Sequence, residues 1–345
     1  MTVHGRHAAL PGQPKIPAVV ALLVCALTVV LIAFTWPAVR SQPRDVPIVV
    51  AGSPEATRFV LMTLQLDVPG VFEPTVVSDR KAATTAIAGR DAYGAILIEP
   101  SGTEVLTASA ASPAVAQLLS QLADRLGGTR GGPPQVTDVV PAPADDPRGG
   151  GLSAGAFPLL LGGIAGSLGL SRLLRSPAKR LAAGTAFCIL GGLALTTVDQ
   201  YWLGALTGEF WANAGVVALG IGSIVVTLLG LARLGGLRSF GLGAAFLLLV
   251  GNPLSGLASA PELLPAGWGA FGQLLPPGAT GSALRSVAFF DGADAGRPLI
   301  VLGVWCVGGL ALFSLGAFRQ HLATRVRSSS AALPLGGEPA RTTAQ

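Results

Sequence analysis

Residues 251–292, GNPLSGLASAPELLPAGWGAFGQLLPPGATGSALRSVAFFDG, lie between two long apolar runs, and the interpretation of the whole chain depends on them. Their five prolines exclude one continuous helix, because each proline lacks a backbone N–H and clashes with the preceding turn. Trp268 and the Phe289-Phe290 pair make the stretch too apolar for a solvated linker. We therefore expect a re-entrant or interfacial hairpin over 258–292, because irregular backbone survives at membrane depth only against protein or a water-filled cavity. A structured loop outside the membrane is the alternative.

Several polar residues and prolines of this stretch are candidates for shaping the hairpin. Asn252, which precedes Pro253, either caps a helix or satisfies freed backbone groups. Arg285 either meets an anionic group of a lipid or substrate, or pairs with Glu262 or Asp291, and we favour the pairing. The remaining candidates are the adjacent prolines Pro276 and Pro277.

The composition is that of a membrane protein with several spans. The chain has 345 residues, of which 50% are hydrophobic and only 12% are charged. Runs near the ~20 residues needed to cross a bilayer predict six spanning helices. The predicted spans are 16–39, 155–171, 181–198, 212–232, 239–257 and 298–318. None contains Asp, Glu, Lys or Arg, which argues against an ion-coupled transporter.

The segments between the spans suggest how the chain is organised. Residues 1–15 form a short polar N-terminus, residues 151–320 form the membrane domain, and residues 321–345 are expected to be a disordered tail. Residues 40–150 have the composition of a small α/β domain followed by a Gly/Pro-rich linker. The predicted fold class is thus an α-helical polytopic membrane protein of six spans with an inserted α/β domain and a re-entrant outer hairpin.

Strand and helix signals alternate within the α/β domain. The expected strands are 45–52, 72–77, 92–99, 104–110 and 135–140. The first helix should begin with Ser53 as N-cap and Pro54 at its first position, and the second, 79–89, with Ser78 as cap. A third helix is expected over 112–126.

Basic residues indicate the orientation in the membrane. With both termini in the cytoplasm, the inner segments hold Arg172, Arg175, Lys179 and Arg180 among many other basic residues, and their only acid is Glu338. The inner side is then strongly positive, which accounts for the net charge of +5 without nucleic acid as a partner. The α/β domain and the hairpin both fall outside.

The sequence contains no convincing pattern of catalytic or metal-binding residues. Residues 151–155, GLSAG, match the spelling of a nucleophile elbow, but the three histidines fall on the other side of the membrane. No P-loop and no metal-ligand spacing is present in the sequence. We expect neither an enzyme nor a cofactor.

The arrangement resembles the permeases of type-2 ABC exporters, and within them the branch related to the phage-infection protein, common in actinobacteria. The likeness is carried by the motifs GNP with SG at 251–256, PELLP at 261–265 and PPGA at 276–279, followed by Arg285 and Phe289-Phe290. Asp91, Tyr93 and Gly94 of the outer domain continue it.

The resemblance implies a homodimer or heterodimer in the bacterial plasma membrane. It also implies a separate cytoplasmic ATPase that drives export of a lipid, polysaccharide, drug or peptide. Arg172, Arg175, Lys179 and Arg180 lie in the loop 171–180, where such exporters place a coupling helix, so they are candidates for contact with that ATPase. The shortness of this loop favours the alternative, an envelope protein without transport activity whose outer domain binds a wall component or partner protein.

Overall fold

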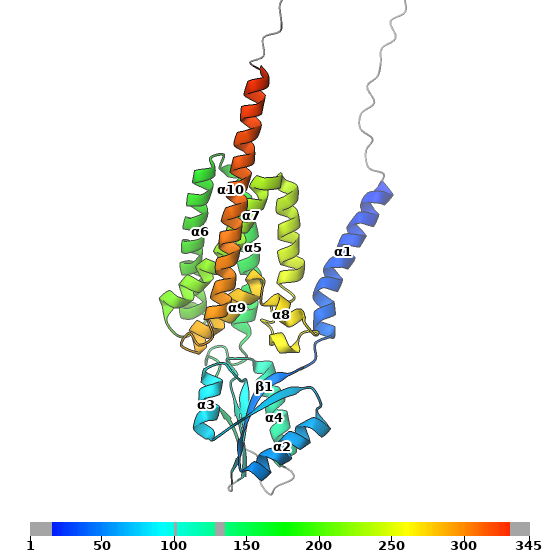
Figure 1. The fold of residues 1–345 in the computed structure, drawn as a ribbon, viewed down its shortest axis with the longest axis vertical. Coiled ribbons are helices and arrows are strands. Elements are labelled where there is room, and N and C mark those ends of the chain that lie inside the picture. The colour runs from blue at the N-terminus through cyan, green and yellow to red at the C-terminus, as the bar shows by residue number, and fades with distance from the viewer. Residues whose placement is uncertain (1–15, 100–101, 128–134, 332–345) are drawn as a thin grey trace, which may run out of the picture.

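A computed structural model describes residues 16–99, 102–127 and 135–331. The described chain is mostly helical, with a small mixed sheet at one end of a helical bundle (Figure 1). Within the described residues, five helices are long and apolar enough to cross a membrane. They are Ile16–Val39, Gly150–Leu173, Pro177–Trp202, Phe210–Gly251 and Gly296–Gln320. The expected N-terminus 1–15, part of the linker at 128–134 and the tail beyond residue 331 lie outside the described residues.

The sequence predicts six spanning segments, whereas the described residues have five such helices, because 212–232 and most of 239–257 fall within Phe210–Gly251. This stretch comprises α7 (Phe210–Phe246) and the π-helix η2 (Leu247–Gly251), and it is interrupted at Gly236, where φ is 71° and ψ −156°. A Cβ on Gly243 would lie 2.4 Å from Leu231 Cδ1. In a straight helix these residues would be ~18 Å apart. The two halves of α7 therefore fold back on each other as a helical hairpin.

Residues 46–138 form an α/β domain whose five-stranded sheet has the order β2-β1-β3-β4-β5. The strands are β1 (Val46–Gly52), β2 (Phe72–Val77), β3 (Gly94–Glu99), β4 (Gly102–Thr107) and β5 (Gln135–Asp138). Only the β3–β4 pair is antiparallel. The helices are α2 (Pro54–Asp67), α3 (Arg80–Ala88) and α4 (Pro113–Gly127). The expected alternation of strands and helices agrees with this order.

Helix starts in this domain follow local capping chemistry. Ser53 caps α2 by accepting from the Ala56 N–H, and Pro54 takes the first helical position, as predicted. The predicted cap of α3 was wrong by one residue: Asp79, not Ser78, is the N-cap, and its Oδ1 accepts from the Ala82 N–H at 2.8 Å. A carboxylate at this position also interacts favourably with the helix dipole.

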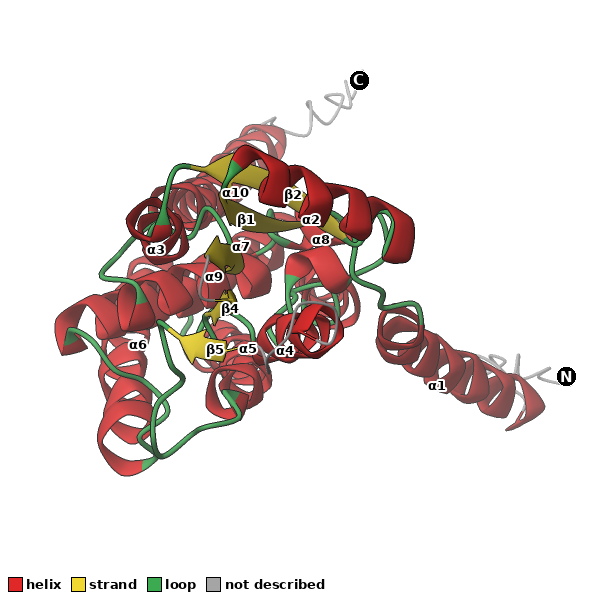
Figure 2. Cartoon of the chain, turned by 90° about the horizontal axis from the view of Figure 1, so that it is seen from below, coloured by secondary structure: helices red, strands yellow, loops and turns green. Residues whose placement is uncertain are grey.

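Residues of the stretch 252–292 complete both hydrophobic cores of the α/β domain. Ala260 belongs to the core beneath α2 and α4, together with Val46, Ile48 and Ile96. Phe290 belongs to the opposite core beneath α3, together with Ala83 and Leu97. Seen from the domain side, the sheet accordingly lies against the end of the helical bundle (Figure 2). The domain and the bundle are therefore packed together rather than joined by a free linker.

The stretch 258–292, predicted as a hairpin, consists of short helical pieces. We call residues 252–292 the outer segment, after their position at the end of the bundle next to the α/β domain. It contains a 3₁₀ turn η3 (Pro261–Leu263), α8 (Trp268–Gly272) and α9 (Pro276–Phe289). The prolines exclude a continuous helix, as expected, but Pro276 and Pro277 begin α9 instead of breaking it. Proline is accommodated in the first turn because its missing N–H would have no helical partner there.

Two other boundaries correct the sequence-based expectations. α6 (Pro177–Thr197) continues into a π-helix, η1 (Val198–Trp202), so Asp199 lies on a helix and not in a loop. Between Gly192 and Gly204, where φ is +61°, no proline or glycine interrupts the chain. α10 (Gly296–Ala331) extends well into the tail predicted as disordered, and Figure 1 shows it projecting beyond the bundle. No proline occurs in this part of the chain before Pro334 to end that helix sooner.

Helix α1 (Ile16–Val39) stands apart from the bundle in both views (Figures 1 and 2). Its spanning window is 0% buried within the chain. The contact lies near its end, where Trp36 and Trp268 of α8 meet edge to face at 5.7 Å between ring centroids. Beyond it, the Gln42 N–H donates to the Leu263 carbonyl and the Arg44 N–H to the Glu262 carbonyl. α1 is thus fastened to the outer segment at its domain-side end.

Candidate functional site

Helix α9 is the most enclosed element of the outer segment. Eleven of its 14 residues are buried, including Arg285, and it contacts α7, α10 and α5 (Gly150–Leu173). The close contact with α7 depends on glycine, since a Cβ on Gly220 would lie 2.5 Å from both Thr280 Oγ1 and Cγ2. The Thr280 hydroxyl donates to the Pro276 carbonyl at 2.7 Å, so its polarity is satisfied within the helix. Small residues therefore allow α9 to pack deeply at the domain-side end of the bundle.

The fold of the outer segment also requires glycine where two backbone segments touch. A Cβ on Gly272 would lie 1.7 Å from the Leu254 carbonyl oxygen, and one on Gly281 would lie 1.8 Å from Leu257 Cδ2. Both distances are far below van der Waals contact. The glycine content that distinguishes this stretch in the sequence is thus explained by close packing.

A polar junction joins the α/β domain to α9 and η3. The Arg90 guanidinium donates to the Ser282 carbonyl at 3.0 Å and to the Ser286 hydroxyl, and it lies 5.5 Å from the centroid of the Phe290 ring. The Tyr93 hydroxyl donates to Glu262 Oε2 at 2.8 Å. Arg90 itself has a left-handed φ of 66°, a costly conformation for a residue with a side chain.

The predicted pairing of Arg285 is not what the structure has. Arg285 is 5% exposed and donates from Nη2 to the Leu257 carbonyl at 3.3 Å, and it makes no ion pair with Glu262 or Asp291. Glu262 is instead engaged by Tyr93. The carbonyl is available because 251–257 leaves regular helix, which frees backbone acceptors.

Burial perturbs the ionisation of the groups at this junction. Burial lowers the pKa of Arg285 to about 10, with Arg90 as a further lowering influence, and burial also lowers the pKa of Arg90. Burial, followed by the charge of Glu262, raises the pKa of Tyr93 well above its usual range. Tyr93 therefore stays a neutral donor to a carboxylate acceptor, and two guanidinium groups share a desolvated region.

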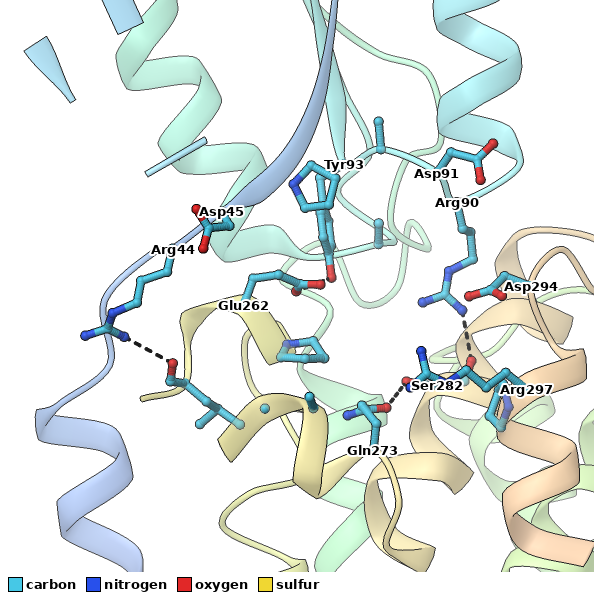
Figure 3. A pocket seen from close by; sticks show the side chains of 18 of the residues that line it. Arg44, Asp45, Arg90, Asp91, Tyr93, Glu262, Gln273, Ser282, Asp294 and Arg297 are labelled. Carbon is cyan, nitrogen blue, oxygen red and sulfur yellow. Dashed lines mark hydrogen bonds between the residues drawn. The ribbon is translucent and has the colours of Figure 1, made fainter. Parts of the chain in front are cut away.

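A polar cavity of about 490 Å³ lies at this junction (Figure 3). Arg44, Asp45, Arg90, Asp91, Tyr93, Glu262, Gln273, Ser282, Asp294 and Arg297 are its polar lining residues. They come from the segment before β1, the α3–β3 connection, the outer segment, the turn 293–295 that follows it and the start of α10. Figure 3 shows Arg44 at one side and Arg90, Asp294 and Arg297 at the other, with Glu262 and Tyr93 between them. Charges of both signs suit this cavity to a polar or zwitterionic group.

A second cavity, of about 330 Å³, lies inside the bundle between α5, α6 with η1, α7 and α9. Its wall is almost entirely apolar, and Asp199 is its only charged lining residue. From α9 it is lined by Pro277, Thr280, Gly281 and Leu284. Cavities of this size, mostly apolar with few polar groups, are typical of small-molecule sites.

Helix α9 separates the two cavities. Its residues Pro277, Gly281 and Leu284 face the apolar cavity, whereas Ser282 faces the polar one. Ser282 is tied to Gln273 by a side-chain hydrogen bond, and Gln273 in turn donates to the Ser255 carbonyl at 2.8 Å. α9 thus lies between an apolar space within the bundle and a polar space beneath the domain.

The sequence-based candidates of the outer segment lie at different places relative to the two cavities. Glu262 lines the polar cavity, Pro277 lines the apolar one, and Arg285 is buried within α9. Asn252 and Pro253 line neither cavity: they follow η2, where the Asn252 N–H donates to the Leu247 carbonyl. Pro276 takes the first position of α9.

The basic loop candidates lie at the opposite end of the bundle. Arg172, Arg175 and Lys179 are exposed, whereas Arg180 donates to the carbonyls of Leu174 and Ser171 at the end of α5. Arg180 therefore satisfies helix-terminal carbonyls. The structure thus leaves three of the four cations exposed.

Sequence reasoning missed the two residues that define the cavities. Arg90 was not singled out, because an arginine next to Gly89 in a polar connection looks like a solvated turn. The predicted span 181–198 ended one residue before Asp199, because π-helical continuation has no sequence signal that distinguishes it from a helix end.

Comparison with protein-family models, with curated proteins and with solved structures finds no match for this chain.

Proposed function

We propose that this chain is a membrane permease subunit of an ABC-type exporter in the bacterial plasma membrane. The observation that carries the proposal is the position of α9 between an apolar cavity in the bundle and a polar cavity beneath the α/β domain. A lipid, drug or other amphiphilic substrate would enter the apolar cavity and leave through the polar one, and α9 would act as the gate. The five long apolar helices of the described residues exceed what anchoring a soluble domain needs, since one span suffices.

The proposed topology has six crossings, with the two halves of Phe210–Gly251 as separate spans. Its 42 residues would measure ~63 Å if straight, about twice the ~30 Å hydrocarbon thickness. Both termini would be cytoplasmic, with residues 40–150 outside. Support comes from Arg172, Arg175 and Lys179, which lie exposed at the end of the bundle away from the α/β domain, as the positive-inside rule favours.

The energy would come from a separate cytoplasmic ATPase, and the permease would act as a homodimer or heterodimer. Arg172, Arg175 and Lys179 are the candidate contacts with that ATPase, since their side chains are exposed. Arg180 is excluded from this role, because its guanidinium is engaged with α5.

The first experiment is affinity purification of the full chain from membranes in mild detergent, followed by mass spectrometry. We expect a stoichiometric ATPase whose ATP hydrolysis changes when the complex is placed in lipid vesicles. Replacement of Arg172, Arg175 and Lys179 by Gln should weaken its recovery, while Arg58→Gln with Arg125→Gln, on exposed or partly exposed sites of the α/β domain, serves as a control. Recovery of the chain without any ATPase would contradict the proposal.

The gating role of α9 can be tested by locking it to α7. A Cβ built on Gly220 lies 3.1 Å from Thr280 Cβ, somewhat closer than the ~3.5–4.5 Å of a disulfide. In a background without Cys25, Cys188 and Cys306, the pair Gly220→Cys with Thr280→Cys should cross-link on oxidation. Transport should then stop and return on reduction, whereas each single variant should be insensitive to oxidant. Full transport in the cross-linked protein would exclude α9 as the gate.

The second candidate function is an envelope protein without transport, whose outer domain binds a wall component or a partner protein. The polar cavity favours it, because charged residues of the α/β domain contribute directly to that cavity. If wall-associated proteins copurify with the chain and no ATPase does, and if Asp91→Asn abolishes that copurification, the results would support this function over the permease.

A further inference from the structure

We infer that the apolar cavity is a binding site for a small organic ammonium ion with a compact apolar body. The inference deepens the proposed function by naming a substrate class, and it rests on that function only for its physiological role. It is argued from the cavity wall, from Asp199 and from a backbone acceptor in α5.

The wall of the cavity gives the ligand its apolar character. α5 contributes Leu152, Ala154 and Leu159, and α9 contributes Pro277 and Leu284. The only hydroxyl in the lining, that of Thr280, already donates to the Pro276 carbonyl. A ligand body there would therefore meet hydrocarbon on most sides.

Asp199 gives the cavity a negative charge. It is the only ionisable lining residue, and in the described chain its carboxylate has neither a salt bridge nor a hydrogen-bond donor. The η1 backbone holds it in place, because the Asp199 carbonyl accepts from the Ala205 N–H at 2.8 Å and from the Leu206 N–H at 3.3 Å. An unpaired carboxylate beside an apolar space favours a cation in that space.

The opposite wall offers a second acceptor and the room to use it. Pro158 lies inside α5 and has no N–H, so the usual helical bond to the Ala154 carbonyl is not made. Ala154 and Gly155 both line the cavity, and a Cβ on Gly155 would lie 3.7 Å from Asp199 Oδ2. Glycine thus leaves space next to the carboxylate, where an ammonium group could donate to Asp199.

The test uses the full chain in lipid nanodiscs, with 1-adamantylammonium and adamantane-1-carboxylate as probes. The two ions share an apolar cage and differ in the sign of charge. Calorimetric titration, with empty nanodiscs to subtract partitioning, should show at least tenfold tighter binding of the ammonium ion. Equal binding of the two ions would overturn the inference.

Two substitutions then locate the site. Asp199→Asn should abolish the preference for the cation, whereas Glu73→Gln, which removes one exposed negative charge on β2, should retain it. Unchanged ammonium binding in a folded Asp199→Asn protein would overturn the inference.

The second substitution does not alter charge. Gly155→Leu should block the space beside Asp199 and lower ammonium binding at least tenfold, whereas Gly162→Leu, on α5 outside the cavity lining and with nothing within 4 Å of an added Cβ, should bind as the unaltered chain does. Undiminished binding in Gly155→Leu would overturn the site even if Asp199→Asn failed to fold.

These outcomes are separable from those of the proposed function. Ammonium binding that depends on Asp199, in a protein that recruits no ATPase and transports nothing, would uphold the site and reject the permease. Transport without ammonium binding would reject the site and leave the permease standing.

Discussion

Helices α1 and α9 both adjoin the α/β domain, yet α1 is almost entirely exposed whereas α9 is almost entirely buried. α1 has 24 residues with no charged side chain, and its spanning window is 0% buried within the chain. α9 has two prolines, two glycines and an arginine among 14 residues, and 11 of these are buried. Burial against protein therefore follows from small residues that permit close contact. A uniformly apolar surface is instead suited to lipid, which solvates it without any complementary partner.

The strongest test of this comparison is Gly272→Ala in the outer segment. The added Cβ would lie 1.7 Å from the Leu254 carbonyl oxygen, so backbone must move. We expect a loss of about 3 kcal/mol or more in the free energy of unfolding, at the upper end of overpacking effects. Thermal unfolding of the full chain in detergent, followed by size-exclusion chromatography, measures it.

The matched control is Gly303→Ala in α10, where nothing lies within 4 Å of the added Cβ. It should leave the unfolding midpoint unchanged or raise it slightly, because alanine favours helix by about 1 kcal/mol over glycine. Equal losses in the two variants would mean that close packing does not distinguish the outer segment.

A smaller effect is expected for Tyr93→Phe, which removes the donor to Glu262 at the junction. The loss of this bond to a charged acceptor should cost about 1–2 kcal/mol. The contribution of this hydrogen bond to stability is expected to decrease at high pH. Since the folded pKa of Tyr93 is raised above 10.0, its contribution is fully present below pH 10 and falls as the pH rises further.

Protection of the α/β domain from proteolysis, measured between pH 8 and 11, checks this prediction. The difference in protection between the unaltered chain and Tyr93→Phe should be constant up to about pH 10, the usual pKa of tyrosine. Above that pH the difference should shrink. A difference that grows with pH would mean that the phenol is not the donor.

The smallest effects are expected in α1. Trp36→Ala removes the edge-to-face contact with Trp268 and should lower the stability of the α1 attachment by about 0.5–1.5 kcal/mol. Leu27→Ala, at a side chain 70% exposed, should change the free energy of unfolding by less than about 0.5 kcal/mol. A large loss for Leu27→Ala would show that α1 has a protein partner over its length.

Much of the fold could be predicted because it depends on local signals. The bounds 16–39 of α1 and 72–77 of β2 follow from apolar runs and turn residues and agree with the structure. The cap at Ser53 follows from side-chain chemistry within a few residues. Where local signals compete, as at Ser78 and Asp79, the prediction was off by one residue.

The candidate site was less accessible from the sequence. Proline and glycine density marked the outer segment, but not that Pro276 and Pro277 would begin a buried helix. The bond from Tyr93 to Glu262 joins residues 169 positions apart, and no local pattern encodes it. Arg285 illustrates the same limit, because its acceptor is a backbone carbonyl freed by irregular chain and not the neighbouring acids.

Local signals specify the apolar helices, the alternation in the α/β domain and the irregularity of residues 251–292, since each depends on hydrophobic period, capping or proline chemistry. The chain reversal at Gly236, the separation of two cavities by α9, and the positions of Asp199 and Arg90 in the cavity linings depend instead on tertiary packing. The physical reason is distance along the chain: local free energies select elements, whereas cavities arise where elements remote in sequence fail to fill the space between them.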